Sequence, residues 1–94
     1  MNDHRTVRLT ITGRVQGVGY RMFLRDEARR LGLSGGVRHR RDGTVEALVS
    51  GPPDATERLV VHARRGPLGG SVASVGIEPA ADAVAAGFDI APTV

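Results

Sequence analysis

The most informative absences in this chain of 94 residues are those of cysteine and lysine. Without cysteine the protein can form no disulfide, carry no thiolate nucleophile and hold no zinc through sulfur ligands. The three histidines, His4, His39 and His62, lack the spacing of metal ligands, and no close carboxylate cluster joins them. We therefore expect no metal and no cofactor.

The lack of lysine leaves arginine as the source of all 13 basic side chains, with a formal net charge of +3. A nucleotide-binding P-loop needs a lysine that contacts the phosphates, so this class of site is excluded. Arginine is itself a good bidentate partner for phosphate, although the composition of a GC-rich genome also explains the bias. The excess positive charge favours anionic ligands.

Aromatic residues and long apolar runs are scarce as well. Tyr20, Phe23 and Phe88 are the only aromatic residues, and none forms a stacking pair on a strand, so we expect no nucleic-acid partner. No apolar run reaches 18 residues, and residues 1–5 are polar. We expect a cytoplasmic protein that does not bind membranes.

What the sequence does contain is an alternation of strand patterns, with a period of two, and helix patterns, with apolar residues three and four apart. The predicted elements are a strand over 6–12, a helix over 20–31, a hairpin over 37–41 and 44–50, a helix over 53–65, a strand over 71–78 and a short final strand over 88–90. This β-α-β-β-α-β order predicts an α+β, ferredoxin-like fold, in which two helices cover one face of an antiparallel sheet.

The face of the sheet on which each hairpin side chain lies indicates the length of the loop between the two strands. A two-residue loop would place arginines on the apolar face of the sheet. A three-residue loop with Gly43 in a bulge puts Val37 and His39 on the apolar face and sets Arg38 opposite Glu46, a favourable cross-strand pair. We predict the three-residue loop.

The run from Gly13 to Arg21, with the sequence GRVQGVGYR, links the first strand to the first helix. Its glycines let successive backbone N–H groups point inward, and the helix N-terminus adds unpaired N–H groups and a positive dipole. Arg21 adds a charged guanidinium in the first turn of the helix. A dinucleotide-binding loop would need glycine at Met22 and a longer chain. The run therefore predicts an anion site suited to phosphate.

This run resembles the signature of the acylphosphatase family, and further matches such as DGTVE at residues 42–46 and RGP at residues 65–67 extend the resemblance over roughly residues 7–90. The resemblance implies one domain over residues 6–92 with the fold predicted above. It also implies hydrolysis of the carboxyl-phosphate bond of small acyl phosphates without metal or cofactor. Inorganic phosphate would bind as product and competitive ligand, and we expect a monomer.

The resemblance further implies the residues of the site. Backbone N–H groups of the loop would cradle the phosphate and the Arg21 guanidinium would clamp it. The phosphate-binding residues would be Val15, Gln16, Gly17, Val18, Gly19 and Arg21. The catalytic residues would be Arg21 and His39.

His39 stands where the family has an asparagine that orients the attacking water, in the string Val37-Arg38-His39. Neutral histidine can accept a hydrogen bond from water at one ring nitrogen, whereas protonated histidine cannot. Three interpretations follow: a functional substitute, a weak enzyme, or a protein that only binds anions. The alternative function is accordingly a catalytically weak module that binds phosphate or carbamoyl phosphate.

Overall fold

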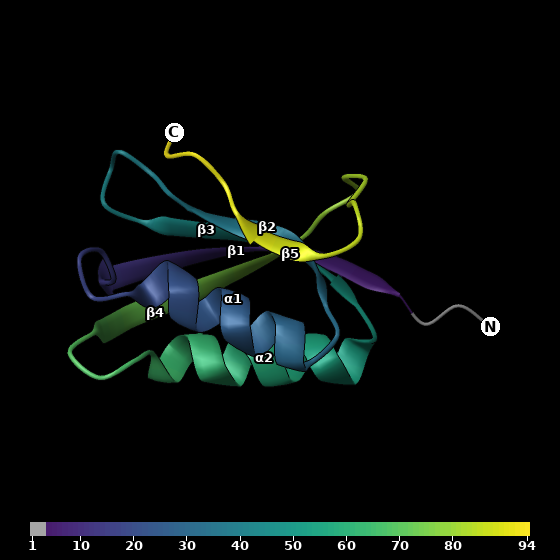
Figure 1. Ribbon diagram of the computed structural model, residues 1–94, viewed down its shortest axis with the longest axis horizontal. Coiled ribbons are helices and arrows are strands. Elements are labelled where there is room, and N and C mark those ends of the chain that lie inside the picture. The colour runs from purple at the N-terminus through teal and green to yellow at the C-terminus, as the bar shows by residue number, and fades with distance from the viewer. Residues whose placement is uncertain (1–3) are drawn as a thin grey trace.

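The computed structural model describes residues 4–94, which form one sheet and two helices (Figure 1). The elements are β1 (Arg5–Arg14), α1 (Tyr20–Arg30), β2 (Ser34–His39), β3 (Val45–Gly51), α2 (Pro53–Arg65), β4 (Ser71–Pro79) and β5 (Phe88–Ile90). The strands lie in the order β4-β1-β3-β2-β5. Both helices lie against the same face of the sheet (Figure 1), so the predicted ferredoxin-like α+β fold is confirmed.

Four of the strands pair antiparallel, as predicted, and the short C-terminal strand adds a parallel pair. β5 lies beside β2, with Gly35 opposite Phe88 and Val37 opposite Ile90. The complete sheet is therefore mixed. A short strand pattern alone carries no information on its partner or direction, which explains why the sequence did not predict this pairing.

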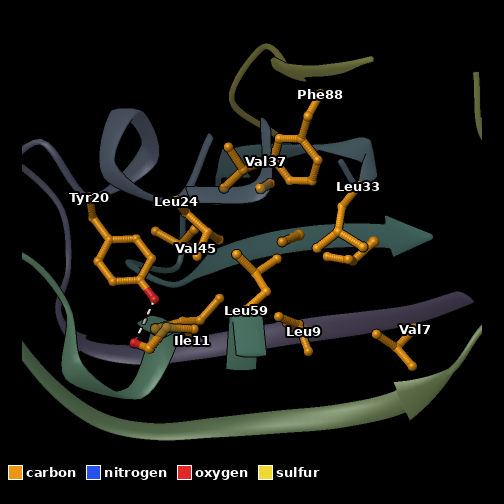
Figure 2. Close-up of a cluster of buried hydrophobic side chains, with 14 of the residues drawn as sticks. Val7, Leu9, Ile11, Tyr20, Leu24, Leu33, Val37, Val45, Leu59 and Phe88 are labelled. Carbon is orange, nitrogen blue, oxygen red and sulfur yellow. Dashed lines mark hydrogen bonds between the residues drawn. The ribbon is translucent and has the colours of Figure 1, made fainter. Parts of the chain in front are cut away.

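The core lies between the sheet and the helices (Figure 2). β1 supplies Val7, Leu9 and Ile11, which alternate with more exposed residues and are almost fully buried. Leu24 of α1 and Leu59 of α2 pack onto this face from the helix layer. The period-two and helical patterns thus converge on one apolar layer, as a two-layer domain of this size requires.

The hairpin between β2 and β3 has the predicted three-residue loop. Arg38 pairs with Glu46 and His39 with Val45, and the Arg40 N–H donates to the Thr44 carbonyl at 2.8 Å. Gly43 closes the loop with φ of 95°, a conformation that residues with a Cβ rarely adopt.

The buried face of helix α2 includes one residue that the predicted apolar stripe did not contain. Thr56 is buried, although its polar side chain gave no such expectation. Its hydroxyl donates to the Pro53 carbonyl at 2.7 Å, which satisfies the polar group locally. His62 is only partly buried, and its Nε2 lies 3.5 Å from a carboxylate oxygen of Glu27.

Within residues 4–94, neither helix is long and apolar enough to cross a membrane.

The two helices are tied together by Tyr20, which begins α1 and is buried. Its hydroxyl donates to the Ala63 carbonyl of α2 at 2.8 Å (Figure 2), and burial raises the pKa of the phenol well above its ordinary value.

We expect Tyr20→Phe to lower the free energy of unfolding by about 1 kcal/mol, because the carbonyl loses a buried donor while the ring packing is kept. Urea unfolding measures this change, and an unchanged midpoint at equal slope would contradict the role of the hydroxyl.

Candidate active site

The loop between β1 and α1 begins with a buried anchor. Val15 is fully buried, and its N–H donates to the Gly13 carbonyl at 3.1 Å. Its N–H is therefore engaged within the protein, in contrast to the outward donor that the family resemblance implied. Gly17 and Gly19 both have φ of 75°, with open space where a Cβ would lie. The loop turns sharply at these two glycines and leads directly into α1.

The backbone N–H groups after Val15 make up a row of free donors. In the part of the chain that the structure describes, the N–H groups of residues 16–19 donate to no protein acceptor. Gly19 is the N-cap of α1 and supplies no side-chain cap, and the first turn contains no acidic residue. The N–H groups of residues 20–22, at the start of the helix, point the same way as the helix dipole and also lack intrahelical acceptors, whereas the Phe23 N–H donates to the Gly19 carbonyl. Together these groups form a positive site without a bound carboxylate.

Arg21 and His39, which lie far apart in the sequence, meet beside this loop. They line one hollow of about 120 Å³ together with Gly17, Gly19, Tyr20 and Met22. The structure thus brings together the loop glycines and both side chains that were expected to be catalytic. Tyr20 and Met22 are additions, although both are sequence neighbours of Arg21 and could have been suspected on that ground.

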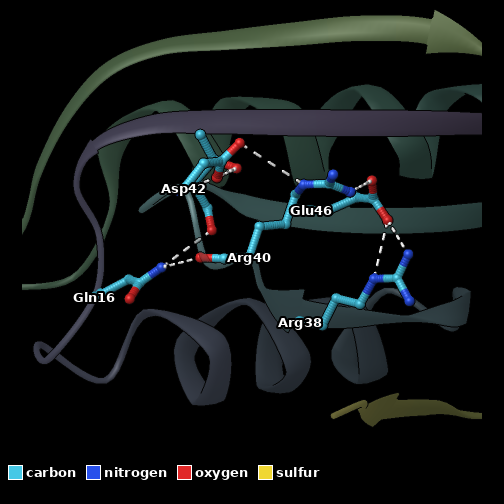
Figure 3. A network of polar contacts seen from close by, with 6 residues as sticks. Gln16, Arg38, Arg40, Asp42 and Glu46 are labelled. Carbon is cyan, nitrogen blue, oxygen red and sulfur yellow. Dashed lines mark hydrogen bonds and ion pairs between the residues drawn. The ribbon is translucent and has the colours of Figure 1, made fainter. Parts of the chain in front are cut away.

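The charge of Arg21 has no carboxylate partner anywhere in residues 4–94. Neighbouring arginines on β2 and its turn are different: Arg38 and Arg40 both contact Glu46, at 2.7 and 2.9 Å (Figure 3). The arginine run at residues 38–41 is therefore largely occupied by its own ion pairs. Arg21 is the guanidinium in the hollow that remains available to an anion.

The surroundings of His39 favour its neutral form. Burial of the ring lowers the pKa of His39 below its ordinary value of 6.5, and the positive charge of Arg21 lowers this pKa further. Both effects favour the uncharged imidazole, which keeps one ring nitrogen as an acceptor. The hollow thus combines donors for an anion with one acceptor that could hold a water molecule.

Among the described residues, no group of three or more histidine, aspartate or glutamate side chains lies close enough to hold a metal ion.

Fold and site together define a small α+β protein in which a loop with unengaged N–H groups at a strand-helix junction lies next to an arginine and a histidine. The acylphosphatase family model matches residues 7–90. The chain is 54% identical over 85 residues to an acylphosphatase of Azoarcus sp., which covers 90% of this chain and 87% of the relative. It is 52% identical over 89 residues to an acylphosphatase of Rhizobium meliloti, with 94% of each chain covered.

The comparison with solved structures indicates the same family. The crystal structure of acylphosphatase from Bacillus subtilis superposes with a TM-score of 0.86 at 33% identity, covering 92% of this chain and 97% of that one. The chain belongs to the acylphosphatase family.

The neutral state of His39 can be tested by NMR. We expect the ring of His39 to titrate with a midpoint below 6.5, and Arg21→Gln to raise this midpoint because a nearby positive charge is removed. Arg58→Gln, a change of an exposed arginine on α2, serves as the matched control and should leave the midpoint unchanged. A midpoint above 6.5, or equal shifts in both variants, would contradict the assigned environment of His39.

Proposed function

We propose that this member of the acylphosphatase family hydrolyses small acyl phosphates in the hollow beside the β1-α1 loop, with Arg21 and His39 as its catalytic side chains. The observation that carries the proposal is the convergence in one hollow of a free arginine, a neutral histidine and a loop with unengaged N–H groups. Family relatives at about half identity support hydrolysis over a module that only binds phosphate.

Binding of the phosphoryl group would use the loop and Arg21. The N–H groups of residues 16–19, together with those of residues 20–22 at the start of α1, would donate to the phosphoryl oxygens. The Arg21 guanidinium would donate to two of these oxygens at once and offset their charge. Phosphoryl transfer depends mainly on such positioning and charge stabilisation, which suits a site made of backbone donors and one arginine.

Attack would come from a water molecule held by His39. The neutral imidazole accepts a hydrogen bond from the water, whose oxygen forms a bond to phosphorus as the bond from phosphorus to the acyl oxygen breaks. The products are a carboxylate and inorganic phosphate, and the proton lost by the water passes through the imidazole or the phosphate to solvent. A carboxylate is a good leaving group, so the site needs no separate general acid.

Several finer features belong to the same proposal. The reaction proceeds without a metal, inorganic phosphate competes with the substrate, and the protein acts as a monomer in the cytoplasm. The backbone donors support the first two of these features, because they can stabilise the charge of a phosphoryl group without a metal and can bind inorganic phosphate in the same way. The absence of cysteine is compatible with the cytoplasm.

Hydrolysis of benzoyl phosphate tests the role of Arg21. We expect Arg21→Ala to lower kcat/KM by a factor on the order of 100 or more, because the charge that develops on the phosphoryl oxygens loses its guanidinium. Arg58→Ala removes an exposed arginine of α2 and should keep the full rate. Wild-type turnover no faster than the uncatalysed reaction, with phosphate still bound, would support the binding module instead. Equal activity of the two variants would remove Arg21 from the mechanism.

A further inference from the structure

The side chain of Gln16 extends from the loop between β1 and α1, here called the phosphate loop, to the hairpin between β2 and β3 (Figure 3). Its Nε2 lies 2.9 Å from the Arg40 carbonyl oxygen and 3.2 Å from the Thr44 carbonyl oxygen. Carbonyl oxygens only accept, so the atom beside them must be the NH₂ group of the amide, and both of its hydrogens are used. Gln16 therefore bridges its own loop to the hairpin, whose two acceptor residues lie 24 and 28 residues further along the chain.

The two acceptors are held in place by the hairpin itself. Arg40 and Thr44 form the last backbone pair before the turn, with the Arg40 N–H donating to the Thr44 carbonyl at 2.8 Å. Asp42 accepts from the N–H and the hydroxyl of Thr44 at 2.9 and 2.7 Å, which fixes the turn from the inside. Gln16 thus contacts the hydrogen-bonded base of the hairpin turn.

The Gln16 bridge joins the two parts of the candidate active site. Arg40 directly follows His39, while Gln16 lies in the loop whose N–H groups are free. The paired part of β1 and β3 ends at Ile11 and Val45, before the loop begins. Beyond that point, the Gln16 amide is the hydrogen-bonded connection among the described residues between the loop and the β2-β3 turn.

We propose that Gln16 is a positioning residue whose amide sets the separation between the phosphate loop and His39. This inference rests on the proposed function, because it gives His39 the role of holding the attacking water. Gln16 does not serve the anion with its side chain, since both amide hydrogens are already donated to carbonyls. Its contribution is to hold the acceptor for water at the distance from the bound phosphorus that in-line attack requires.

Two substitutions separate the bridge from the size of the side chain. Gln16→Met keeps the length but removes the donor, and Gln16→Asn keeps the amide but shortens its reach. We expect each to lower kcat for benzoyl phosphate by about tenfold, since a displacement of about 1 Å can cost a factor on the order of 100. KM and the inhibition constant of inorganic phosphate should stay within about twofold, because the backbone donors and Arg21 remain.

The His39→Ala background shows whether Gln16 acts through His39. There, Gln16→Met should change kcat by less than about twofold, since the two residues then act as one unit and their effects do not add. An equal fall of kcat in both backgrounds, an unchanged kcat in the single variants, or a loss of phosphate affinity that exceeds the loss of kcat would overturn the proposal. Failure of the proposed function is distinguishable, because the wild type and the His39→Ala variant would then hydrolyse benzoyl phosphate equally.

Discussion

The site depends on a row of backbone N–H groups that the protein leaves without acceptors at the start of α1. Free donors are costly when they are buried, so they persist where water or an anion can reach them. Gly17 and Gly19 make the row possible, because their left-handed conformations turn the loop into the helix without a side-chain cap. The absence of acidic residues in the first turn keeps the positive potential available to a ligand.

Contacts of three residues in or next to the loop hold this row of N–H groups in place. Val15 anchors the start of the loop in the core, and Tyr20 fixes the start of the helix to α2 through its hydroxyl. Gln16 connects the middle of the loop to the hairpin that carries His39. Core packing, the contact between the helices and the hairpin turn therefore all help to fix the residues around one small hollow. Electrostatic stabilisation by preorganised donors requires such fixed positions.

Much of the fold could be predicted because it depends on local patterns. The alternation in β1 and the facing of Arg38 against Glu46 in the hairpin follow from the period of two. The parallel pairing of β5 and the two bonds of Gln16 join segments remote in sequence, and no local signal encodes them. The resemblance to the family, and not spacing, placed Arg21 and His39 in one site, while the engaged N–H of Val15 was visible only in the backbone geometry.

The central claim is that phosphate binds at the β1-α1 loop and not at the other arginines. The outer face of the sheet offers a larger hollow of about 300 Å³, lined in part by Arg8 and Arg38, but Asp82 and Glu46 pair with these two arginines. Titration of the ¹⁵N-labelled protein with inorganic phosphate tests the claim most directly. The account predicts saturable shifts of the amide signals of residues 16–22. Shifts centred on the outer face, with the loop signals unmoved, would contradict it.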